Sequence, residues 1–269
     1  MSRNPNYLLE VGKADQQRLE ILHKIYSPFT VEFLKNAGLK TGMHVAEVGC
    51  GEGDMSCLFA QLVGSAGKVT AADISEVQLK IAEAKAKKLK LTNIEFKQIS
   101  VNEFSKLNQK FDLVYSKWVL IFVKNAFDGL RQMYDSLKPG GILSCEECSA
   151  SRTNVFSSPQ TDCIDFFCKL MSTNFHAMGL DGYSGDKMYS YFEKLQCKSL
   201  QIKMHQPVLL TPEEKMAYRL TYISTKKTTL ELKTFSEAMM DDMIQQAELF
   251  EQQDGFIASV RNVLVSGRK

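Results

Sequence analysis

The sequence predicts an α/β fold built on a mainly parallel sheet, and two observations lead to this class. Short apolar runs, of the kind that is buried on both faces of a sheet, alternate with helical segments along the first 147 residues. Glycine and proline separate these segments at the rhythm of strand–helix–strand units, which join parallel strands through right-handed crossovers. A chain of 269 residues has room for one large domain, or for one domain with an accessory part.

The first half of the chain carries the clearest pattern. A helix is expected over residues 15–37, broken near Ser27 and Pro28 because proline ends or restarts a helix. The expected strands cover residues 43–48, 68–73, 93–99, 111–116 and 141–147. Helices are expected between them, over residues 54–63, from Ser75 with Gln78 in capping-box spacing, and over about 125–137.

The second half is less regular. Residues 148–185 show no clean alternation of strand and helix and are interpreted as an insertion with some helix. A helix over 186–195, a strand over 199–210, a helix with Pro212 in its first turn and a further helix follow. The chain closes with an expected strand over 256–269, at or near a sheet edge. Two helices between two late strands predict a lid at about 211–253.

Composition excludes several classes of protein. The hydrophobic fraction of 44% and the charged fraction of 24% are those of a soluble globule, and a net charge of +2 gives no electrostatic case for nucleic-acid binding. No apolar run reaches the length of a membrane span, and the N-terminus lacks the apolar core of a signal peptide. Seven cysteines, an odd number, do not indicate a disulfide framework, so a cytoplasmic location is expected. Cys145 and Cys148 lack a second pair, so no metal site is predicted.

The stretch "HVAEVGCGEGDMS", residues 44–56, predicts a ligand-binding turn between a strand and a helix. Asp54 stands where the dinucleotide fingerprint requires its third glycine. Together with Glu47 and Glu52 it would oppose a diphosphate, because each like-charge pair at ~4 Å costs on the order of 4 kcal/mol. S-adenosylmethionine fits better, since it carries a sulfonium and an ammonium and its ribose could bind Asp73. A tight turn that merely requires small residues, without any ligand, is the alternative.

Three motifs resemble those of the class I S-adenosylmethionine-dependent methyltransferases: "VAEVGCGEG", the acid in "AADIS" and "LKPGGIL", within residues 38–147. The N-terminal "YLLEVGKADQQRLEILHKIY" and the final "NVLVSGRK" are similar to a subgroup with a helical N-terminal cover that acts mostly on small molecules. The resemblance implies a Rossmann-like seven-stranded sheet, mostly parallel with an antiparallel last strand. It divides the chain into an N-terminal helical cover (1–37), a cofactor-binding half (38–147), an insertion (148–185) and the end of the core with its helical lid (186–269).

The resemblance also implies a set of cofactor-binding residues: Glu47, Gly49, Cys50, Gly51, Asp73, Ile74, Ser100, Val101 and Ser116. Glu47 would hold the methionine ammonium, Asp73 the ribose hydroxyls, and Ile74 would pack on the adenine. Ser100 stands where the family often has an acid, and a hydroxyl is the weaker acceptor.

Catalytic residues are less evident, because methyl transfer needs a general base only when the nucleophile must lose a proton. His23 on the N-terminal helix and His176 in the insertion are the weak candidates, and Phe122 stands where the family often has histidine. His44 and His205 are expected to be structural. Tyr7 and Tyr26 could line the entrance, with ordinary aromatic packing as the alternative. Glu147 is favoured over Glu146 for access to the pocket.

The expected function is S-adenosylmethionine-dependent methylation of a small apolar or aromatic acceptor at oxygen, nitrogen or carbon, without a metal. The alternative is a protein of the same fold that binds the cofactor without transferring methyl, as a non-methylating catalyst or a regulator. A nucleic-acid or protein methyltransferase is disfavoured by the near-neutral charge and by the absence of an N/D-P-P-Y/F motif. The expected partner is therefore a small molecule, with no nucleic acid and no membrane span, and a homodimer is left open.

Overall fold

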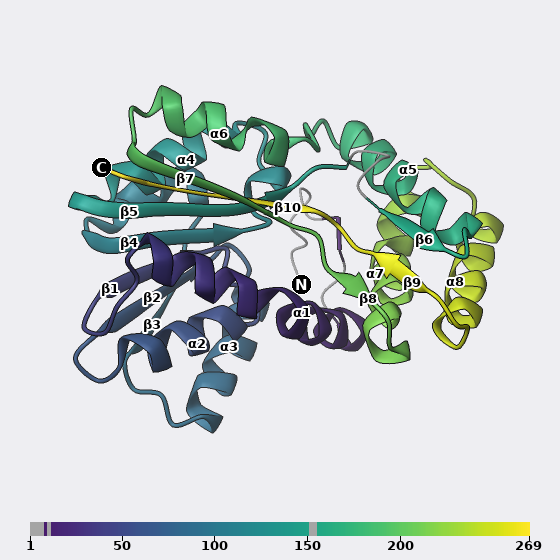
Figure 1. Ribbon diagram of the computed structural model, residues 1–269, viewed down its shortest axis with the longest axis horizontal. Coiled ribbons are helices and arrows are strands. Elements are labelled where there is room, and N and C mark those ends of the chain that lie inside the picture. The colour runs from purple at the N-terminus through teal and green to yellow at the C-terminus, as the bar shows by residue number, and fades with distance from the viewer. Residues whose placement is uncertain (1–7, 10–11, 151–154) are drawn as a thin grey trace.

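The computed structural model describes residues 8–9, 12–150 and 155–269, and its core is a seven-stranded sheet (Figure 1). In the order β3-β2-β1-β4-β5-β10-β7, the strands are β3 (Ile94–Gln98), β2 (Lys68–Asp73), β1 (His44–Val48), β4 (Phe111–Lys117), β5 (Leu137–Cys148), β10 (Asn262–Arg268) and β7 (Lys198–His205). Strands β3 to β5 pair in parallel, and β10 runs antiparallel to both of its neighbours. The predicted fold class is confirmed.

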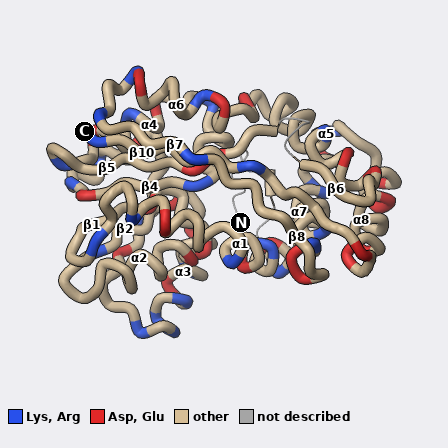
Figure 2. The backbone as a smooth tube through the Cα atoms, in the orientation of Figure 1, with Lys and Arg blue, Asp and Glu red and all other residues tan. Residues whose placement is uncertain are grey.

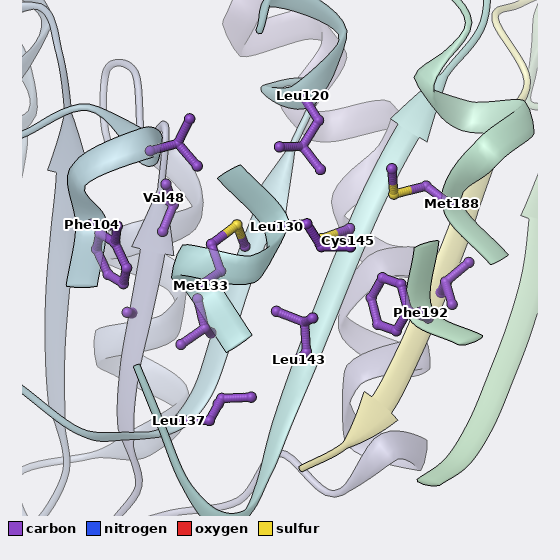
Figure 3. Packing of buried hydrophobic residues seen from close by; sticks show 14 of the residues in the cluster. Val48, Phe104, Leu120, Leu130, Met133, Leu137, Leu143, Cys145, Met188 and Phe192 are labelled. Atoms are coloured by element: carbon purple, nitrogen blue, oxygen red, sulfur yellow. The ribbon is translucent and has the colours of Figure 1, made fainter. Parts of the chain in front are cut away.

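Helices cover both faces of this sheet because its strands are apolar on both sides. On one face lie α2 (Asp54–Val63), α3 (Glu76–Lys88) and the C-terminal part of α1 (Lys13–Ala37). On the other face lie α4 (Ala126–Asp135) and α6 (Ser184–Lys194). Figure 3 shows this second layer, in which Leu130, Met133, Met188 and Phe192 of the helices pack near Leu143 and Cys145 of β5.

A second apolar core lies beyond the carboxyl ends of the parallel strands. It joins α5 (Asp162–Ala177), α7 (Pro212–Glu231) and α8 (Glu237–Glu251) to a small antiparallel sheet of β6 (Phe156–Ser158), β9 (Phe256–Ala258) and β8 (Val208–Leu209). The N-terminal part of α1 packs on α7 through Ile21, Ala217 and Leu220. Helix α1 therefore connects the two cores. None of the helices in the described ranges is long and apolar enough to cross a bilayer.

The helix starts predicted at Ser75 and at Pro212 are confirmed. The Ser75 hydroxyl accepts a hydrogen bond from the Gln78 backbone N–H at 3.3 Å, at the start of α3. Thr211 and Glu214 form a reciprocal capping box at the start of α7, with Pro212 as the first helical residue.

The predicted break at Pro28 is wrong, because α1 continues through it to Ala37. Pro28 is exposed, so its ring points away from the packed face and its cost to the helix is confined to the local backbone. Residues on either side, Tyr26 and Thr30, are buried and hold both halves of the helix in place.

The C-terminal strand differs from the prediction in being divided into β9 and β10, which belong to different sheets. Strand β10 lies near a sheet edge, as expected, between β5 and β7. Strand β7 forms that edge, and it ends at His205 instead of continuing to residue 210. Strand β10 is hydrogen-bonded to a strand on each side, and six of its seven residues are buried. Its largely apolar sequence suits this buried position.

Candidate functional site

The glycine turn after β1 is a tight cradle in which two of the three glycines leave no room for a side chain. Gly49, Gly51 and Gly53 all have positive φ, at 72°, 54° and 81°. A Cβ on Gly49 would lie 2.2 Å from a methyl carbon of Val119, and one on Gly53 would lie 2.7 Å from the Cβ of Ala82. The turn is thus packed against the loop after β4 on one side and against α3 on the other.

Asp73, at the carboxyl end of β2, is fixed beside this turn. One carboxylate oxygen accepts from the Gly51 N–H at 2.9 Å, and the other accepts from the Ser75 N–H at 2.8 Å. Burial raises the pKa of Asp73, while these backbone donors act in the opposite direction. The carboxylate is held rigidly where the first two strands end.

Two further acids of the turn are buried with few partners. The Ser56 hydroxyl donates to Glu47, and burial raises the pKa of Glu47 to about 8. Burial also raises the pKa of Glu52 to about 7, and its Oε1 has no hydrogen-bond partner among the described residues. Asp54 is paired with Lys85 at 2.7 Å. Buried carboxylates of this kind favour a cationic ligand and oppose an anionic one.

A cavity of about 840 Å³ opens over the carboxyl ends of β1, β2 and β4. One side, which we call the strand-end half, is lined by the glycine turn and the residues that follow the strands: Glu47, Gly49, Cys50, Gly51, Asp73, Ile74, Ser100 and Val101. The other side, the helical half, is lined mainly by apolar and aromatic residues: Phe122, Phe167, Met171, Phe175, Ala217 and Tyr218. Two ligands of different chemistry can therefore lie side by side.

The structure brings most of the predicted site residues to this cavity, but leaves two outside it. Ser116 is buried within β4, where its hydroxyl donates to the Cys145 sulfur at 3.3 Å. His176 is exposed in the last turn of α5 and does not line the cavity. His23 does line it, and burial lowers the pKa of its imidazole.

The two structural histidines lie away from the cavity wall. His44 begins β1, at the end of the strand remote from the glycine turn, and its ring packs on Phe111. His205 stacks on Phe29 with ring centroids 4.2 Å apart. Tyr26 is buried and lines the cavity, and its hydroxyl donates to the Val260 carbonyl at 2.7 Å. Tyr7 lies outside the described residues.

The prediction that Glu147 faces the pocket is wrong. Its carboxylate accepts from the backbone N–H groups of Val119 and Leu120, at 2.9 and 2.7 Å, and from the Ser184 hydroxyl at 3.1 Å. These donors belong to the loop after β4, which includes the short helix η2 (Leu120–Phe122), and to α6. Glu147 shapes the cavity by fixing that loop and does not line it.

A neighbouring ion pair was missed by the sequence analysis. Lys117 lines the cavity and pairs with the buried Glu146 at 3.1 Å. The sequence "CEEC" could have indicated such a pair, because two buried acids in an apolar strand each need hydrogen-bond donors or a cation. No group of three or more His, Cys, Asp or Glu residues placed to hold a metal occurs in the described part of the chain.

Known proteins resemble this chain in sequence and in fold. Residues 39–196 match the model of a family described as "Methyltransferase domain". A demethylmenaquinone methyltransferase of Listeria welshimeri is 33% identical over 135 residues, which cover 50% of this chain and 57% of the relative. A ubiquinone/menaquinone biosynthesis C-methyltransferase of Psychromonas ingrahamii is 33% identical over 129 residues, 48% of this chain and 50% of that protein.

These matches span only about half the length of the curated relatives. Among solved structures, that of a putative methyltransferase from Bacillus halodurans aligns with a TM-score of 0.59 and 19% identity, over 89% of this chain and 97% of that one. At this identity the likeness shows the fold alone.

Proposed function

The chain belongs to the methyltransferase-domain family, and we propose that it transfers a methyl group from S-adenosylmethionine to a small apolar acceptor. The observation that carries this proposal is the two-part cavity, with carboxylates in the strand-end half and aromatic side chains in the helical half. Quinone methyltransferases among the sequence relatives support an apolar acceptor.

The strand-end half fits this cofactor. Glu47 and the unpartnered oxygen of Glu52 suit cationic groups, and the glycine turn leaves room for the methionine part at the backbone. Asp73 would accept the ribose hydroxyls, and Ile74, Ser100 and Val101 would surround the adenine, since all four line the cavity. When bound, the cofactor supplies a methyl group on a sulfonium, which is an excellent leaving group.

The protein contributes mainly by positioning the two reactants, because holding them in the reacting geometry accounts for a large part of the rate enhancement. Phe122 and Phe175 pack edge to face with centroids 5.4 Å apart and would hold an apolar ring against the methyl group. Helix α7 contributes Ala217 and Tyr218 to the same wall, so residues 211–253 would act as the cover that excludes water.

His23 is the proposed general base for an acceptor that must lose a proton. Its imidazole lines the cavity, and its lowered pKa leaves it neutral and able to accept a proton at neutral pH. The cytoplasmic location, the absence of a nucleic-acid partner and a homodimer stay predictions.

An experiment with methyl-labelled S-adenosylmethionine tests the proposal. The protein is incubated with the labelled cofactor and an untargeted extract of small molecules, and the organic phase is searched for labelled product. We expect a labelled apolar product that is absent with heat-denatured protein. Cofactor binding without any labelled product would instead support the non-methylating alternative.

A further inference from the structure

Lys117 is a buried cation on the wall of the cavity, at the end of β4. Its side chain is 12% exposed. Ser116 pairs with Val48, so Lys117 lies level with the start of the glycine turn. A buried ammonium is costly unless partners replace its water, so the contacts of Lys117 indicate which ligand the position suits.

Three groups hold the Lys117 ammonium. Glu146 lies 3.1 Å from Nζ, and the ring centroids of Tyr26 and Trp118 each lie 4.6 Å from it. Trp118 has a left-handed backbone, with φ at 51°, and its indole N–H donates to the Asn262 side-chain oxygen at 3.0 Å. The aromatic rings therefore have fixed positions around the cation.

Glu146 is already saturated with donors besides Lys117. Its Oε2 accepts from the hydroxyls of Thr30 and Tyr115, at 2.6 and 2.9 Å, and its Oε1 accepts from the Asn262 amide. An ammonium has three N–H donors, and the rings offer no lone pair. Glu146 is the only described acceptor of Lys117, so donors remain for a ligand in the cavity.

An anion is the ligand that suits these donors. The carboxylates that line the cavity within the described residues are Glu47, Glu52, Asp54 and Asp73, and all lie in or beside the strand-end half. The sulfonium and ammonium of the cofactor are cations and would be repelled by Lys117. Tyr26, whose ring Lys117 contacts, is hydrogen-bonded to Ser259 and Val260, which also line the cavity.

We infer that Lys117 binds the oxyanion of the methyl acceptor, which is therefore an apolar molecule with an ionisable hydroxyl, of the phenol or enol class. This rests on the proposed function. The acceptor hydroxyl gives its proton to His23. The electron pair of the oxygen, or of a conjugated carbon, forms the bond to the methyl carbon, while the carbon–sulfur bond breaks and its electrons stay on sulfur. When carbon is methylated, the proton on that carbon then moves through solvent to the acceptor oxygen and restores its hydroxyl, so the only proton released is the one that His23 holds.

Binding of 4-nitrophenol and of its methyl ether, 4-nitroanisole, tests this inference. Both are measured by calorimetry on protein saturated with S-adenosylhomocysteine, at a pH where 4-nitrophenol is ionised. We expect the phenolate to bind about tenfold or more tightly than the ether, the difference that a charge-assisted hydrogen bond contributes. The preference should disappear in Lys117→Met and persist in Lys117→Arg.

A second pair of variants separates ligand binding from a structural role, because Lys117→Met leaves the buried Glu146 without its cation. The double variant Lys117→Met, Glu146→Gln removes both charges and should also lack the preference, whereas Glu146→Gln alone should keep it. Equal affinity for phenolate and ether in the wild type, including no binding of either, would overturn the inference. So would a selective loss of S-adenosylhomocysteine affinity in the Lys117 variants, which would place Lys117 on the cofactor carboxylate. Failure of the wild type to bind S-adenosylhomocysteine would instead contradict the proposed function.

Discussion

Cofactor affinity should depend on pH through Glu47. Burial raises the pKa of this carboxyl to about 8, so the free protein carries mostly the neutral form at neutral pH. The ammonium of the cofactor favours the ionised form, so binding lowers that pKa and releases a proton. Affinity should therefore rise with pH up to about 8 and level off above it.

The size of the change in cofactor affinity follows from the difference between the pH and the pKa of Glu47. At about pH 6, roughly one Glu47 in a hundred is ionised if its pKa is about 8, and binding should be about 100-fold, or about 2.7 kcal/mol, weaker than on the plateau. Titration calorimetry with S-adenosylhomocysteine at constant ionic strength measures this slope.

The variant Glu47→Gln identifies the contribution of this residue. Glu52, whose pKa is raised to about 7, should also make cofactor affinity rise with pH, over a lower pH range. Asp73, whose pKa is raised too, contributes in the same direction. The steep part between about pH 6 and 8 should flatten in Glu47→Gln. An affinity that is independent of pH in the wild type, or an unchanged slope in the variant, would show that ionisation of Glu47 is not coupled to cofactor binding.

Three other substitutions have matched controls or clear readouts. Gly49→Ala should lose cofactor binding and should destabilise the fold by about 1–3 kcal/mol more than Gly140→Ala. Both glycines have positive φ, but of the two only Gly49 has a neighbouring side chain that an added Cβ would clash with. Chemical denaturation of the two variants measures this difference. Glu147→Ala should lower the free energy of unfolding by about 2–4 kcal/mol, since it leaves buried N–H groups without acceptors, and a change within error would contradict this role. His23→Gln should reduce turnover of the identified acceptor by about 10²–10⁴-fold while cofactor affinity is retained. The same change at the exposed His176 should leave turnover intact. Equal effects of the two substitutions would exclude His23 as the base.

The sequence was most informative where local pattern and function coincide. The strands that lead to the glycine turn and to Asp73 are short, mainly apolar runs, so both the parallel sheet and the position of its ligand-binding edge could be predicted. The acids around the turn could also be recognised, because charge next to glycine is visible without a structure.

Features that depend on distant contacts could not be predicted. Pro28 is tolerated because its side of α1 is exposed, which no local signal reveals. The helical half of the cavity comes from η2, α5 and α7, which are far apart along the chain, and the exposed His176 does not line it. Alternation in β5 could not decide between Glu146 and Glu147, since both are buried and each finds its donors on other elements.

The charge distribution in Figure 2 places acidic residues along the segments between β1 and α3, beside the carboxyl ends of the strands. We propose that this acidic turn accepts a cationic sulfur nucleoside and rejects a dinucleotide diphosphate. Calorimetric titration of the wild type with S-adenosylmethionine and, in a separate run, with NADH distinguishes the two ligands. We expect saturable binding of S-adenosylmethionine and no binding of NADH; tighter binding of NADH would show that the acids do not select a cationic ligand.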